Sequence, residues 1–120
     1  MTVPPSKDRR RVPRFQVWIA CSVVSQLNDE DFREQAVLGQ TKDLSREAIA
    51  VLLSANETYG VDASSIGKQV QMTLALPIGY VRLSATLVRY EPEDGKYLCV
   101  FRIQGSEERS RYDDYLDSLE

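Results

Sequence analysis

Apolar and polar residues alternate in several separate stretches of this chain, and this alternation constrains the fold more than any other feature. Every second residue is apolar from Phe15 to Val23, and the same pattern returns in 70–76, 81–87 and 97–103. Successive side chains of a β-strand point to opposite faces, so a period of two predicts strands that bury one face. Two weaker strands are expected, over 36–42 and over the apolar run 49–53.

The segments between these strands have the composition of turns. Asp94-Gly95, within 91–96, is a strong hairpin signal, and Pro77 ends the strand before it. Residues 43–48 (DLSREA) predict a tight turn, because Asp and Ser bond their own backbone. A short helix capped by Asp43 or Ser45 is the structural alternative.

The period changes to that of a helix near the end of the chain. Ser106 suits an N-cap, and four apolar residues then follow at helical spacing on one face, namely Tyr112, Tyr115, Leu116 and Leu119. The sequence therefore predicts a mainly β fold: a six-stranded antiparallel β-barrel with a C-terminal α-helix over about 106–119.

The sequence also allows expectations for two loops and for one outward-facing tryptophan. We expect loops over 27–35 and 54–68, with Val61 and Ile66 packing the second loop against the core. Trp18 falls on the outer face of the first strand, where we expect another element to cover it.

Charge divides the chain into an arm and a domain. The formal net charge is −3, which argues against a protein that coats nucleic acid polymers. The first 14 residues are nevertheless strongly basic, carrying Lys7, Arg9, Arg10, Arg11 and Arg14 against Asp8. We expect residues 1–14 to form a flexible basic arm and 15–120 to form the barrel domain with its helix. A local basic site on an acidic body suits a small anion.

The chain lacks the residues that most enzymes and metal sites use. It has no histidine, and its two cysteines, Cys21 and Cys99, stand apart inside apolar runs. We therefore expect no enzymatic activity, no cofactor and no metal, and reduced core cysteines. The polar, proline-bearing start shows no signal peptide, and no apolar run reaches the ~18 residues of a membrane span. The expectation is a cytoplasmic protein with no membrane insertion.

Two polar motifs are the candidates for a binding site. The arm contains Arg10-Arg-Val-Pro-Arg14, an RxxxR spacing that spans roughly 13 Å in an extended chain. Two arginines so placed can hold two parts of one anionic ligand. The turn contains Asp43, Ser45 and Ala48 in the order DxSxxA.

With both motifs in this order, the chain resembles the PilZ family of cyclic di-GMP receptors. That family pairs an RxxxR arm with a [D/N]xSxxG turn, and the resemblance covers nearly the whole chain, including Val88-Arg89 at the end of the fifth strand. It implies a non-enzymatic bacterial receptor that takes cyclic di-GMP as ligand and signals to a downstream protein, for example in motility or biofilm control.

The chemistry of the ligand fits the residues that the resemblance selects. An arginine fork meets guanine O6 and N7 bidentately and also binds phosphate, which are the roles implied for Arg10 and Arg14. Asp43 is the candidate acceptor for the guanine N–H donors, and Ser45 adds a hydroxyl. Arg9, which extends the motif to RRxxxR, is a further ligand candidate by resemblance to receptors that hold two stacked ligand molecules.

One position departs from the family pattern. Ala48 stands where the family has glycine, and a turn that requires a positive φ would cost alanine roughly 1 kcal/mol. Ala48 therefore keeps open an alternative function: a PilZ-like adaptor that binds no cyclic di-GMP and acts by protein contact in pilus or flagellar control. The oligomeric state, the partner and the number of ligands per chain are left open by the sequence.

Overall fold

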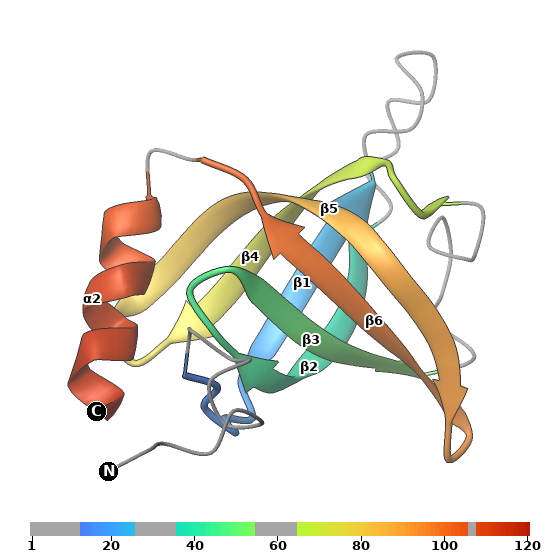
Figure 1. The fold of residues 1–120 in the computed structure, drawn as a ribbon, viewed down its shortest axis with the longest axis horizontal. Helices are drawn as coiled ribbons and strands as arrows, with labels where there is room; N and C mark the ends of the chain where they lie inside the picture. The colour runs from blue at the N-terminus through green and yellow to red at the C-terminus, as the bar shows by residue number, and fades with distance from the viewer. Residues whose placement is uncertain (1–12, 26–35, 55–64, 106–107) are drawn as a thin grey trace, which may run out of the picture.

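The structure is a computed structural model that describes residues 13–25, 36–54, 65–105 and 108–120. The described residues form a mainly β fold with one C-terminal helix, as predicted (Figure 1). The elements are β1 (Ala20–Ser25), β2 (Ala36–Leu44), β3 (Ala48–Ser54), β4 (Gln69–Leu76), β5 (Gly79–Glu93), β6 (Lys96–Ile103) and α2 (Arg109–Leu119).

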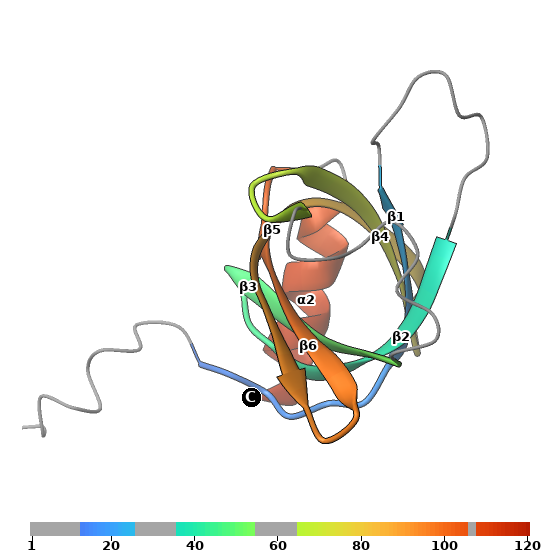
Figure 2. The same cartoon turned by 90° about the vertical axis from the view of Figure 1, so that its right-hand side faces the viewer.

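The six strands close into an antiparallel barrel in the order β1-β2-β3-β6-β5-β4. The ring closes because β1 pairs with β2 on one side and with β4 on the other. The long strand β5 pairs with β4 through its first half and with β6 through its second half. Figure 2 looks along the barrel and shows the ring of strands with α2 at its far end.

The barrel interior is filled by the residues that the alternating pattern predicts. The inward set of β4 is Val70, Met72, Leu74 and Leu76, and all four are buried. The inward residues of β5 and β6 follow the same rule, except that Tyr97 is only partly buried. The hairpin at Asp94-Gly95 is also confirmed, with both residues at positive φ. It is shorter than the predicted 91–96, because β5 continues to Glu93 and β6 begins at Lys96.

Helix α2 covers one end of this core. Tyr112, Tyr115 and Leu116 are buried in the same cluster as the barrel residues, and Leu119 packs against it. The helix begins at Arg109 with Glu108 at the N-cap position and no side-chain capping bond, so it starts later than the predicted 106. Ser106, the predicted cap, lies outside the described residues.

The start of the barrel differs from the prediction of one strand from Phe15 to Val23. Regular pairing begins only at Ala20. Just before that point the Thr41 N–H still donates to the Ile19 carbonyl, whereas the Thr41 side chain replaces other ladder bonds. Its hydroxyl accepts the Ile19 N–H at 2.9 Å and donates to the Val17 carbonyl.

Two predictions about apolar side chains were wrong. Trp18 is 59% exposed rather than covered by another element. Ile66 is 49% exposed, and its neighbour Ser65 is buried in its place. Val61 and the loop 27–35 lie outside the described residues. Nowhere in the described segments is there a helix with the length and apolar character needed to cross a membrane.

Candidate ligand-binding site

A short backbone bridge fixes the end of the arm beside the DxSxxA turn. The Phe15 N–H donates to the Leu44 carbonyl at 2.8 Å, and the Leu44 N–H donates back to Phe15 at the same distance. Phe15 follows Arg14 and Leu44 lies between Asp43 and Ser45, so this pair brings both motifs to one edge of the barrel. Arg9 and Arg10 lie outside the described residues.

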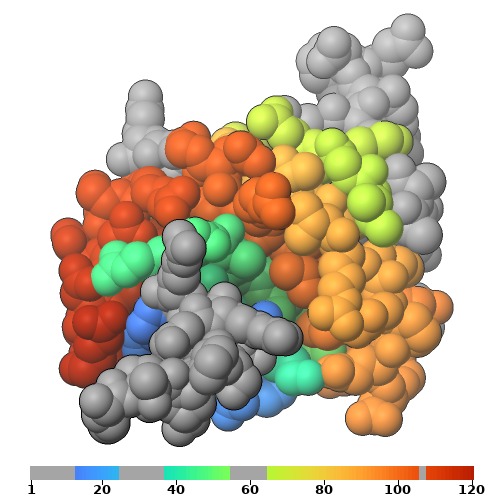
Figure 3. Space-filling model, viewed as in Figure 1, coloured from blue at the N-terminus to red at the C-terminus, as the bar shows by residue number. Residues whose placement is uncertain are grey.

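An open groove of about 700 Å³ lies at this edge, which is within the usual size range of small-molecule sites. Its lining comes from the end of the arm, from the segment before β1, from β2 and from the end of α2, namely Arg14, Phe15, Gln16, Val17, Asp43 and Leu119. In the space-filling view the first described residues (blue) lie beside helix α2 (red) (Figure 3).

A smaller pocket of about 30 Å³ shares Arg14 and Asp43 with this groove and continues over Ser45 and Ala48. The structure therefore brings together four of the six predicted site residues. Arg14 is exposed and Asp43 is half-buried. Within the described residues, no hydrogen bond or ion pair engages either side chain, so both charges are available to a ligand.

The DxSxxA segment forms the predicted turn rather than a helix. The Ser45 N–H donates to the Ala48 carbonyl at 2.9 Å, and the Ala48 N–H donates to the Ser45 hydroxyl at 3.1 Å. The same hydroxyl lies 3.1 Å from the Ala48 carbonyl, to which it donates. These bonds are local ones that serine characteristically makes, and they hold the Ser45 side chain at the base of the small pocket.

Ala48 does not occupy the strained conformation that its place in the motif suggested. Among the described residues, Asp94 alone has a positive φ without being glycine. Ala48 instead opens β3, where it pairs with Arg102 of β6. The turn is therefore built without the penalty of about 1 kcal/mol that positive φ would impose on alanine.

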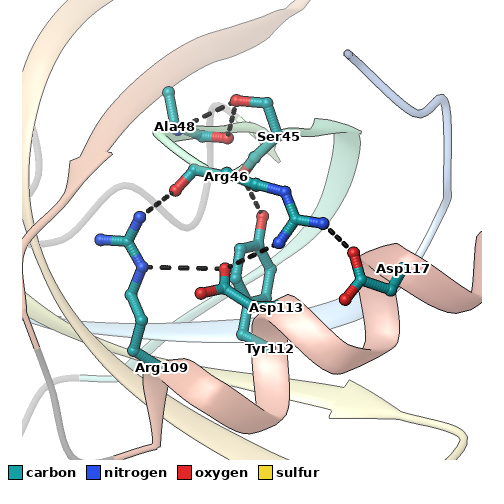
Figure 4. Close-up of polar contacts among 7 residues, drawn as sticks. All are labelled: Ser45, Arg46, Ala48, Arg109, Tyr112, Asp113 and Asp117. Carbon is teal, nitrogen blue, oxygen red and sulfur yellow. Dashed lines mark hydrogen bonds and ion pairs between the residues drawn. The ribbon is translucent and has the colours of Figure 1, made fainter. Parts of the chain in front are cut away.

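Helix α2 holds the turn from behind through Ser45 and Arg46 (Figure 4). The Tyr112 hydroxyl donates to the Ser45 carbonyl at 2.6 Å, and Arg109 donates to the Arg46 carbonyl at 2.5 Å. The Arg46 guanidinium donates a hydrogen bond to Asp117, and this bond raises the pKa of Arg46 above the ordinary value for arginine.

Arg46 was not among the predicted site residues. Its partners lie 63 to 71 positions away along the chain, so only the closed barrel brings them together. The described residues contain no group of three or more His, Cys, Asp or Glu that could hold a metal ion. A cationic and an anionic side chain beside a hydroxyl, facing an open groove, can bind an anion that also presents N–H donors.

Comparison with solved structures finds the same fold in several bacterial proteins. The PilZ domain of YcgR from Escherichia coli, solved with c-di-GMP, has a TM-score of 0.65 and 20% identity over 87% of this chain and 85% of that one. The K. pneumonia MrkH–c-di-GMP complex has a TM-score of 0.72 and 16% identity, covering 92% of this chain and 51% of MrkH.

Bacillus subtilis MotI/DgrA, an inhibitor of motility, has a TM-score of 0.63 and 16% identity over 89% of this chain. The chain spans about half the length of that protein, 48%. A comparison with curated proteins found no match. A protein-family model for the PilZ domain matches residues 8–118, and the chain therefore belongs to the PilZ domain family.

Proposed function

We propose that this chain is a non-enzymatic bacterial receptor that binds cyclic di-GMP in the groove beside the DxSxxA turn and relays the signal to a partner protein in the cytoplasm. The observation that carries the proposal is the Phe15–Leu44 backbone bridge, because it places Arg14 and Asp43 in one groove. Family membership and the c-di-GMP complexes of YcgR and MrkH support the choice of ligand.

Each side chain has a defined role in this proposal. Arg14, with Arg10 and Arg9 from the arm, binds phosphate and the O6/N7 edge of guanine through the guanidinium fork. Asp43 accepts from the N–H groups on the opposite edge of guanine. Ser45 contacts the ligand through its hydroxyl, and Ala48 lines the floor of the small pocket.

Isothermal titration of the full chain with cyclic di-GMP tests the proposal and gives the stoichiometry. We expect saturable binding to the wild type. Arg14→Ala should weaken binding by about 30- to 150-fold. This range corresponds to the loss of about 2–3 kcal/mol of charge-assisted hydrogen bonding. Arg82→Ala is the matched control, since Arg82 is an exposed arginine of β5 that pairs with Glu108 and lines neither pocket, so this variant should bind as the wild type does.

The adaptor alternative predicts a different result. A protein that acts only by contact gives no heat with tens of micromolar cyclic di-GMP, and its function survives Arg14→Ala. The position of Ala48 in place of glycine was the reason for this alternative. The regular φ of Ala48 removes the strain part of that reason, so we favour the receptor.

A further inference from the structure

We propose that the Arg46 clasp, defined as Arg46 with Asp113 and Asp117 of helix α2, positions the DxSxxA turn for ligand binding. This inference rests on the proposed function and deepens it. Arg46 is then a positioning residue, which acts on the ligand through Ser45 rather than by touching it.

The first step of the argument is that every backbone carbonyl of the turn from Ser45 to Glu47 is bound from outside the turn. The Ser45 and Arg46 carbonyls accept from Tyr112 and Arg109 of α2. The Glu47 carbonyl accepts the Ile103 N–H at 2.8 Å. The conformation of this turn therefore depends on where the helix lies, and not only on the local bonds of Ser45.

The second step is that the clasp is a network rather than an isolated surface pair. Arg46 hydrogen-bonds Asp117 and lies 3.6 Å from Asp113, while Arg109 lies 3.8 Å from the same Asp113 oxygen. That oxygen is buried and has no hydrogen-bond partner in the described part of the chain, so its charge is balanced by the two guanidinium groups. Figure 4 shows the Arg46 guanidinium pointing toward both carboxylates.

The third step is that the helix also reaches the groove. Leu119, two positions after Asp117, lines it together with Arg14 and Asp43. One rigid helix therefore carries a wall of the groove and the residues that hold the turn. A shift of the helix would move the Ser45 carbonyl and, through the Ser45–Ala48 bonds, the hydroxyl that faces the small pocket.

The experiment measures cyclic di-GMP affinity of full-chain Arg46→Ala, Asp117→Asn and the double variant. Each single variant should weaken binding by about 5- to 20-fold, as expected for a coupling at the lower end of its usual range. The double variant should be no weaker than either single one, because both remove the same clasp. Arg46→Lys, which keeps the charge, should recover part of the loss.

Thermal unfolding of the same variants separates positioning from a structural role. Asp117→Asn removes one exposed ion pair and should shift the melting temperature by less than about 4 °C, so its lost affinity cannot come from unfolding. Arg46→Ala also takes a cation from the buried Asp113 oxygen and should shift the melting temperature further. Glu93→Gln, which weakens the partly exposed pair with Lys42 and lies outside both pockets, should shift the melting temperature about as little as Asp117→Asn and leave the affinity unchanged.

Three results would overturn the inference, and each is distinguishable. If Arg46→Ala weakens binding but the loss of both its carboxylate partners, in Asp113→Asn/Asp117→Asn, does not, Arg46 contacts the ligand directly. If the wild type, Arg46→Ala and Asp117→Asn all bind equally well, the clasp has no role in binding, whereas the proposed function stands. If the wild type itself does not bind, the proposed function fails and the inference fails with it.

Discussion

Ala48 shows that the strand around a motif position can decide which backbone conformation that position takes. In the sequence, Ala48 occupies the position where the family motif has glycine. In the structure, it is the first residue of β3 and does not have a positive φ. Its N–H is used by Ser45 and its strand partner is Arg102. Ala48, the position at which the chain departs from the family motif, is therefore under no backbone strain.

Ala48→Gly should therefore not improve the site. We expect cyclic di-GMP affinity to stay within about twofold of the wild type. The free energy of unfolding should fall by about 0.5–1 kcal/mol, because glycine in a strand loses more backbone freedom on folding. Titration and urea denaturation measure the two quantities. A fivefold gain in affinity would show that the alanine Cβ obstructs the ligand.

The pKa values of the two cysteine thiols also depend on their surroundings. Burial raises the pKa of the Cys21 and Cys99 thiols to about 12 each, whereas unfolded thiols titrate near 8.5. Below the unfolded pKa both states keep the proton and stability is full. As the pH rises from about 8.5 toward 12, only the unfolded chain releases protons, so stability is lost over that window.

The expected result is a lower urea midpoint at pH 10 than at pH 7.5. The loss per thiol is at most about 1.4 kcal/mol for each pH unit above 8.5. The Cys21→Ala/Cys99→Ala variant should show a shallower decline, with a remainder from Tyr112, whose phenol pKa burial also raises. Equal slopes for the two proteins would contradict the assignment to the thiols.

At the scale of elements, the alternating pattern predicted β4, the first half of β5 and most of β6 almost residue by residue. A strand in a barrel has only two faces, so the period alone decides which side chains are buried. The start of β1 could not be predicted in this way. There, the hydroxyl of Thr41, a residue of another strand, replaces ladder bonds for Val17 and Ile19.

The candidate site was predictable only in part, for a similar reason. Arg14, Asp43, Ser45 and Ala48 carry a spacing that can be read along the chain, and they line neighbouring pockets. Arg46 carries no such spacing relative to Asp113 and Asp117. A contact between residues about 70 positions apart depends on barrel closure, which the local pattern does not encode.

Gly39 lies in β2, which the sequence predicted only as a weak strand over 36–42. It faces the core opposite Leu53, and a Cβ would lie 2.6 Å from Leu53 Cδ2 and 2.9 Å from the Leu52 carbonyl. The glycine is thus required for β2 and β3 to approach one another closely.

Gly39→Ala should consequently destabilise the barrel by about 1–3 kcal/mol, the usual cost of overpacking a core. Gly105→Ala is the matched control, because a Cβ there meets nothing within 4 Å and the φ is not positive. Urea denaturation of both variants checks the prediction. Equal stability of the two variants would mean that β3 moves aside without cost.

At the scale of the whole molecule, helix α2 joins parts of the barrel that are distant in sequence. Near its start, Arg111 donates to the Tyr80 carbonyl at 3.1 Å, and Glu108 pairs with Arg82, so this end is tied to β5. On another face of the helix, Arg109 and Tyr112 hold the carbonyls of the DxSxxA turn. Between these ties the helix closes the core, so barrel and helix should unfold together.

Leu116→Ala tests this closure against a control on the same helix. Leu116 is fully buried, so its truncation should cost about 2–5 kcal/mol, whereas half-buried Leu119→Ala should cost clearly less. Because the helix covers the core, far-UV and near-UV circular dichroism should report one shared transition in both variants. An early helical transition that leaves the barrel signal intact would show that α2 is a separate cooperative unit. In that case a ligand at the groove could release the helix without loosening the strands.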